Sequence, residues 1–119
     1  MIKKYKKYIK NLINNLNDYK DLNDETLYPL LKIARKQNKP YELIKILNCS
    51  GYNLKNLNGI EHLINLEYLD CSNNLLTTLD GIENLHYIKY LKCYSNNFSI
   101  KYKVQISEYF KKEGVLILI

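Results

Sequence analysis

Three cysteines recur at equal intervals in this 119-residue chain: Cys49, Cys71 and Cys93 lie 22 residues apart. Thiols in such a series could ligate a metal, form disulfides, or fill the same interior position of a repeating structure. A zinc site normally needs four ligands, commonly in short paired spacings, and the sequence contains no such set. The odd number of thiols and the expected reducing compartment argue against disulfides. We therefore interpret the cysteines as a reduced, buried, metal-free column, and we expect no cofactor.

The repeat around the cysteines extends to the neighbouring apolar residues. Leu47, Leu69 and Leu91 precede the three cysteines by two positions. The segments "NGIEHL" and "DGIENL" also coincide, and the matching apolar positions of the first two units are Leu54, Leu57, Ile60 and Leu63 against Leu76, Leu79, Ile82 and Leu85. A period of this length is the signature of a solenoid, in which each unit buries its apolar edge only by stacking on its neighbours.

The second unit, "LEYLDCSNNLLTTLDGIENL", resembles the 22-residue leucine-rich repeat of bacterial internalins. The resemblance covers about residues 41–100, with Asn74 and Asn96 at the asparagine position of that repeat. Tyr52 replaces the asparagine in the first unit, and the pattern of the third unit stops after Phe98. The resemblance implies a concave parallel sheet and protein binding as a class of function, although a fold alone does not identify a partner.

The ends of the chain are expected to cap this array. A lysine-rich helix is predicted over Ile2 to Leu16, and a second from Thr26 to Lys39 with Leu27, Leu30, Leu31 and Ala34 on its apolar side. Downstream, the spacing of Tyr102, Ile106, Tyr109 and Phe110 predicts a helix, which Gly114 ends, and "VLILI" predicts a last strand of the parallel sheet. The predicted fold class is thus α/β: a short leucine-rich-repeat solenoid in one domain, 1–119, with an N-terminal cap (1–40), repeats (41–100) and a C-terminal cap (101–119).

The formal net charge of +6 is concentrated at the ends of the chain. Residues 1–40 hold ten Lys and Arg against four Asp and Glu, whereas residues 41–100 hold four against six. Five lysines among the first ten residues, with Tyr5 and Tyr8 between them, support an alternative function, which is binding of nucleic acid or an anionic membrane. A solvated face of a capping helix would explain the same lysines.

The leading hypothesis is a non-catalytic module that binds a protein partner through the concave face. Alternate residues of a strand face opposite ways, so the outward positions can be written down from the repeat. They form three columns: Ile46, Tyr68 and Tyr90; Asn48, Asp70 and Lys92; Ser50, Ser72 and Tyr94. Tyrosines are common anchors of interfaces, and they are also favoured at β positions of any sheet; both interpretations stay open.

No catalytic motif accompanies these columns. The sequence has no glycine-rich phosphate loop and no nucleophile elbow, and His62 and His86 have neither a nucleophile nor an orienting partner nearby in the repeat. We therefore expect no enzymatic activity and no small-molecule substrate. The chain has no long apolar run and no secretory signal at its start, so a cytoplasmic setting is expected.

Overall fold

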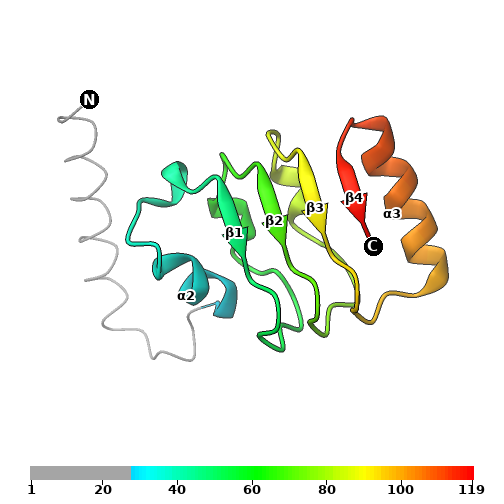
Figure 1. Cartoon of the computed structure of the whole chain (residues 1–119), viewed down its shortest axis with the longest axis horizontal. Helices are drawn as coiled ribbons and strands as arrows, with labels where there is room; N and C mark the ends of the chain where they lie inside the picture. Colours follow the sequence, from blue (N-terminus) through cyan, green and yellow to red (C-terminus); the bar gives the residue numbers. More distant parts are fainter. Residues whose placement is uncertain (1–27) are drawn as a thin grey trace.

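A computed structural model describes residues 28–119 and shows a mixed α/β fold built on one four-stranded parallel sheet (Figure 1). The strands are β1 (Ile46–Asn48), β2 (Tyr68–Asp70), β3 (Tyr90–Lys92) and β4 (Leu116–Leu118), and they lie in chain order. Ile46 pairs with Tyr68, Tyr68 with Tyr90, and Tyr90 with Leu116. The 22-residue interval therefore sets the register of the first three strands, and the strand predicted at "VLILI" is confirmed.

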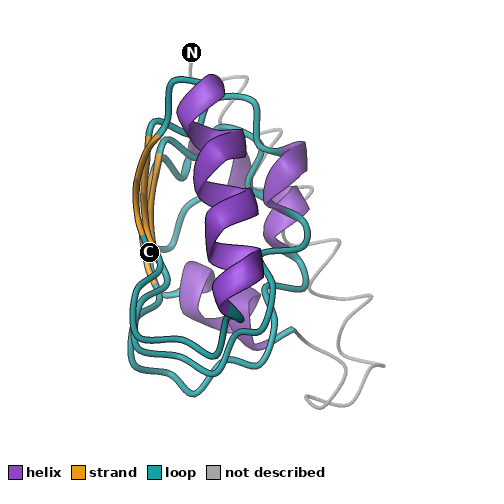
Figure 2. Cartoon of the chain, turned by 90° about the vertical axis from the view of Figure 1, so that its right-hand side faces the viewer, coloured by secondary structure: helices purple, strands orange, loops and turns teal. Residues whose placement is uncertain are grey.

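The core lies on one side of this sheet. The middle residues of β1, β2 and β3 are buried leucines, and Cys49, Cys71 and Cys93 are buried one step beyond the strands. Opposite them lie three short 3₁₀ helices, η2 (Tyr41–Leu43), η3 (Ile60–His62) and η4 (Ile82–Asn84). Figure 2 shows the strands as one layer, with every described helix on the same side of it. The other face of the sheet is not covered by any element of residues 28–119.

Asn74 and Asn96 tie successive units together at the corner after each strand. The Asn74 carboxamide oxygen accepts from the backbone N–H groups of Tyr52 and Leu54, and its amide donates to the carbonyls of Cys49 and Cys71. One unit later, Asn96 accepts from the Leu76 N–H and donates to the carbonyls of Cys71 and Cys93. Each asparagine forms hydrogen bonds to the unit before its own. Position 52 is the equivalent position of the first unit, which follows no other repeat unit, so an asparagine there would lack these partners. Tyr52 instead is exposed and lies against Lys36, whose Nζ is 5.0 Å from its ring centroid.

Two glycines allow the return segments to pack closely. Gly59 and Gly81 precede η3 and η4 with φ angles of 95° and 103°, in the left-handed region that favours glycine. A Cβ atom on Gly59 would lie 2.8 Å from Leu31 Cγ, and one on Gly81 would lie 2.9 Å from Ile60 Cγ2. Each 3₁₀ helix therefore starts where its backbone contacts the layer before it.

Helix α2 (Pro29–Arg35) covers the start of the array. Pro29 lies in its first turn, and Leu30, Leu31 and Ala34 are buried as predicted, together with Ile33. The predicted end at Lys39 is wrong: Arg35 is the last helical residue, because the chain turns back at Asn38, whose φ is 53°. Thr26 and Leu27, and the predicted helix from Ile2 to Leu16, lie outside the described residues.

Helix α3 (Ile100–Lys112) follows Phe98 and closes the other end of the array. Its first turn is capped by Ser99, whose side-chain oxygen accepts from the Tyr102 N–H at 3.1 Å. The helix ends before Gly114, which has a φ of 75°. The helix predicted from the spacing of Tyr102, Ile106, Tyr109 and Phe110 is confirmed, with Phe110 buried and Tyr109 45% exposed. Residues 109 and 110 are one helical step of about 100° apart, and only one of them can point straight at the core.

Neither α2 nor α3 is long and apolar enough to cross a membrane, and these are the α-helices of the described residues.

Candidate interaction surface

The uncovered face of the sheet, here called the open face, carries two rows of side chains that run across the strands. The first row follows the outward residues at the start of each strand: Ile46, Tyr68, Tyr90 and Leu116. The second row follows those at the end of each strand: Asn48, Asp70, Lys92 and Leu118. Ile46 is 63% exposed and Leu116 is 59% exposed, so the first row presents apolar surface to solvent at both ends.

The two tyrosines at the centre of the first row pack against each other. The rings of Tyr68 and Tyr90 are nearly parallel, with an interplanar angle of 6° and centroids 4.8 Å apart. This separation matches the spacing of neighbouring strands, so the sheet itself sets the stack. Each ring covers one face of the other, and both side chains remain partly exposed.

Lys92 lies beside this stack and keeps its charge. Its Nζ is 6.0 Å from the centroid of the Tyr90 ring. The pKa of Lys92 is raised, chiefly by the phenolic groups of Tyr68 and Tyr90, whose negative charge at high pH favours the ammonium form. At neutral pH the open face therefore presents one cation next to two aromatic rings.

Asp70 and Asn48 are held in place by the residues two positions later. Asp70 Oδ1 accepts from the backbone N–H of Ser72 at 3.1 Å and from its hydroxyl at 2.6 Å. Asn48 Oδ1 accepts the same pair of bonds from Ser50. These bonds fix the side chains of Asn48 and Asp70, two of the four residues in the second row.

The third predicted column is only partly on the open face. Tyr94 is 40% exposed, but Ser72 is 1% exposed, so Ser72 offers almost no surface to a partner. The strands end at Asn48, Asp70 and Lys92, but the next residue in each unit is a buried cysteine, so the alternation continues one step further. The Ser72 hydroxyl donates to the carboxylate of the outward residue Asp70.

Three further residues belong to this surface and were not predicted from the sequence. Leu116 and Leu118 were missed because β4 follows β3 by 26 residues rather than 22, although the alternation in "VLILI" marks them. Glu67 was missed at the edge of the first row, where it pairs with Lys89 at 2.6 Å and with Lys45 at 3.9 Å. The hydrogen bond and charge of Lys89 lower the pKa of Glu67. Positions 45, 67 and 89 are 22 residues apart and alternate in charge, which is a signal for a cross-strand row.

A shallow depression adjoins the open face at its β1 edge. Gln37 reaches this edge and donates a hydrogen bond from Nε2 to the Ile46 carbonyl at 2.8 Å. The depression is lined by Ile33, Lys36, Gln37, Ile46, Leu47, Asn48 and Tyr52. The first row therefore continues into a hollow beyond Ile46.

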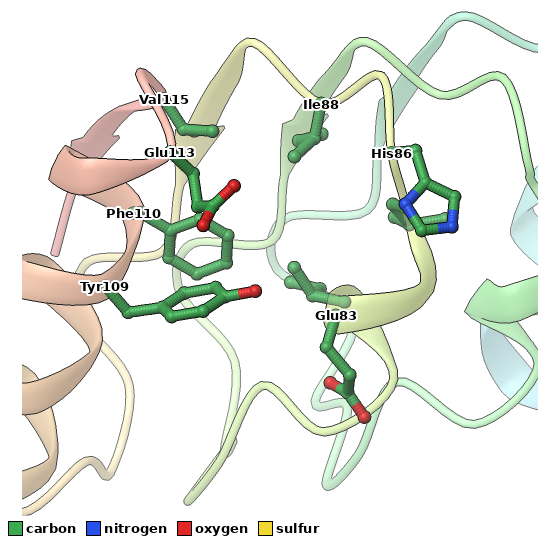
Figure 3. A pocket seen from close by; sticks show the side chains of 9 residues that line it. Glu83, His86, Ile88, Tyr109, Phe110, Glu113 and Val115 are labelled. Carbon is green, nitrogen blue, oxygen red and sulfur yellow. The ribbon is translucent and has the colours of Figure 1, made fainter.

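A small cavity of about 110 Å³ lies on the opposite side of the molecule, between α3 and the segment around η4. Figure 3 shows the Tyr109 hydroxyl and the Glu113 carboxylate beside it, while Glu83 and His86 point away from its centre. Its other lining residues are the apolar Ile82, Leu85, Ile88, Phe110 and Val115. This arrangement brings together no nucleophile and base, and both His62 and His86 are exposed.

The cysteines form the buried column expected from the repeat. Burial raises the pKa of Cys49 and of Cys93 to about 12, and that of Cys71 well above its ordinary value of 9.0. The thiols are therefore protonated at neutral pH and are weak ligands and nucleophiles. Among residues 28–119, no group of three or more His, Cys, Asp or Glu side chains is placed to hold a metal ion.

The lysines that suggested nucleic-acid or membrane binding, Lys3, Lys4, Lys6, Lys7 and Lys10, lie outside the described residues. That function stays a sequence-based prediction.

Comparisons of the chain with protein-family models, with curated proteins and with solved structures found no match.

Proposed function

We propose that this chain is a non-catalytic protein-binding module of the leucine-rich-repeat type, whose partner contacts the open face of the sheet. The observation that carries the proposal is the first row, in which a stacked tyrosine pair lies between two exposed aliphatic residues. Aromatic rings that are partly exposed on a rigid scaffold offer contact area with little loss of side-chain entropy on binding.

The repeat supports the structural part of this proposal. The register of β1, β2 and β3 follows the 22-residue interval, and both corner asparagines bond the preceding unit. These are the positions at which the second unit resembles a leucine-rich repeat. A solenoid of this kind would present the open face as its concave side, with α2 and α3 as caps.

The experiment is affinity capture from a lysate of the source cells with the wild-type chain and two double variants. Tyr68→Ala with Tyr90→Ala removes the stack; the matched control, Ile64→Ala with Tyr87→Ala, removes two exposed apolar side chains that lie outside the strands. Binding should fall by about 2 kcal/mol or more in the first variant and stay unchanged in the control. Equal capture by all three proteins would contradict the proposal.

Two further measurements separate the alternatives. Leu69 lies between Tyr68 and Asp70 in β2, but its side chain is buried in the core, so Leu69→Ala should cost about 2 to 5 kcal/mol of folding free energy, whereas the tyrosine variant should remain folded. Binding of RNA or anionic vesicles that weakens steeply with salt and is lost on replacing Lys3, Lys4, Lys6 and Lys7 with Gln would favour the lysine-rich segment instead.

A further inference from the structure

The open face offers only side chains to a partner, because the backbone groups between its neighbouring strands are already paired within the sheet. The Cys49 N–H donates to the Asp70 carbonyl, the Cys71 N–H to the Lys92 carbonyl and the Cys93 N–H to the Leu118 carbonyl, each at 2.8 Å. A segment pressed onto the first row must therefore satisfy its own backbone donors and acceptors as it leaves water. An α-helix does so within itself, whereas an extended segment would need a sheet edge.

The spacing of the first row also matches a helix that crosses the strands. Neighbouring strands lie about 4.8 Å apart, so the three intervals from Ile46 to Leu116 span about 14 Å. An α-helix rises about 5.4 Å per turn, so successive turns of a crossing helix would lie over successive strands. About ten helical residues cover this length, with apolar side chains at intervals of three and four.

The second row adds a charge pattern beside the apolar one. Asp70 and Lys92 lie opposite each other in the register of β2 and β3. Neither takes part in the ion pairs of residues 28–119, which join Glu67 to Lys45 and Lys89. Ser72 fixes the Asp70 carboxylate, and Tyr90 lies under the Lys92 ammonium. A helix on the first row would complement both charges with a basic residue over Asp70 and an acidic residue over Lys92. These two residues would be one turn apart, hence three or four positions in sequence.

We propose that the partner segment is an amphipathic α-helix of about three turns, lying across the strands along Ile46, Tyr68, Tyr90 and Leu116. Its apolar stripe contacts the first row, and an acidic and a basic residue one turn apart contact Lys92 and Asp70. This inference rests on the proposed function and adds the conformation, direction and charge pattern of the segment bound.

The test uses a displayed library of random 16-residue peptides, selected on the full chain and counter-selected on the Tyr68→Ala, Tyr90→Ala variant. The enriched peptides are then bound to full-length chains that carry a photo-crosslinking phenylalanine derivative at position 46 or at position 116. These positions mark the two ends of the first row, and the peptide residue that each captures is identified by mass spectrometry. An isotope-labelled second preparation of the chain reports any crosslink to another copy.

The expected result is that the two captured residues lie about ten positions apart, which is 14 Å at about 1.5 Å per helical residue. An extended peptide would place them about four positions apart, at about 3.3 Å per residue. A separation near four would overturn the inference and leave the proposed function standing. Crosslinks to a second copy of the chain in place of the peptide would also overturn it. Failure to enrich any tyrosine-dependent peptide would count against both the inference and the proposed function.

A charge exchange tests the second row separately. Lys92→Glu should lower the affinity of the selected peptides at least about tenfold. Replacing the acidic residue of the peptide with Lys should restore most of the lost affinity. The matched control is Lys45→Glu, which changes a lysine next to the first row, on the side away from the second row. If Lys92→Glu has no effect, or if no substitution in the peptide restores binding, the proposed charge pattern is wrong.

Discussion

At the scale of single residues, each buried polar group of residues 28–119 has a partner that the repeat supplies. No buried side-chain nitrogen or oxygen in that part of the chain lacks a hydrogen bond. Asn74 is the clearest case, because one carboxamide satisfies two backbone N–H groups and three carbonyls at a buried corner. The corner can therefore turn sharply inside the protein without leaving backbone groups unpaired.

Asn74→Ala should destabilise the fold more than Asn96→Ala. The first substitution leaves the N–H groups of Tyr52 and Leu54 without their acceptor, which should cost about 3 to 5 kcal/mol. Asn96 is less buried and accepts from one N–H group, that of Leu76, so its loss should cost about half as much. Urea denaturation followed by circular dichroism measures both values. Equal costs for the two variants would show that the corner bonds do not determine the difference.

The cysteines should make the free energy of unfolding depend on pH in the alkaline range. Their pKa values are raised in the folded state, so the folded chain holds these protons more tightly than the unfolded chain. This contribution to stability is fully present below the ordinary thiol pKa of 9.0 and is lost as pH rises from there toward about 12. The free energy of unfolding should therefore fall across this interval, and it should fall less steeply in Cys71→Ala than in the wild type.

Thiol labelling provides an independent measurement on the same residues. At neutral pH a thiol reagent should react slowly with the folded protein and rapidly once denaturant is added, because all three thiols are buried. The native mass should correspond to the metal-free chain. Stoichiometric zinc that resists dialysis would contradict the interpretation of these cysteines as packing residues.

At the scale of elements, the period of the sequence predicts the sheet, and departures from the period limit the prediction. The pairing of Ile46 with Tyr68 and Tyr90 follows directly from the 22-residue interval. The end of α2 at Arg35 does not, because it depends on a left-handed turn at Asn38. Leu116 and Leu118 were not predicted as residues of the open face, because helix α3 lengthens the interval between β3 and β4. A repeat therefore predicts what is repeated, and the caps are set by local turns.

The candidate surface shows the same limit. The sequence predicts that Tyr68 and Tyr90 share a column, since both occupy the same repeat position. It does not predict that their rings stack, because side-chain torsions are not fixed by spacing. Nor does it predict the burial of Ser72, whose hydroxyl bonds the Asp70 carboxylate.

Gly81→Ala tests how the return elements are packed. The new Cβ would lie 2.9 Å from Ile60 Cγ2, and the φ of 103° would be strained for alanine, so at least about 2 kcal/mol of stability should be lost. Gly114→Ala is the matched control, because Gly114 also has a positive φ, 75°, but open space around it. It should cost about 1 kcal/mol. Thermal or chemical denaturation of the two variants measures the difference, and equal costs would exclude the close contact as its cause.

At the scale of the whole molecule, the array is closed by elements that do not belong to the repeat. Helix α3 begins where the third unit would continue, and Phe110 inserts from it into the same core as Leu85 and Leu91. The Tyr102 hydroxyl also accepts from the backbone N–H of Leu79 at 2.7 Å, so the helix bonds the second unit as well as covering the third. Without such a cap, the last apolar layer would face water.

The consequence is that damage to this cap should weaken the nearer strands first. Phe110→Ala should cost about 3 to 5 kcal/mol, because it leaves a cavity at the end of the core, whereas Tyr109→Ala, which removes an exposed ring one position earlier, should cost about 1 kcal/mol or less. If contacts run mainly between neighbouring units, amide hydrogen exchange in Phe110→Ala should accelerate most in β3 and β4 and least in β1. Uniform acceleration across all four strands would instead show that the described residues open as one unit, in which every strand depends equally on α3.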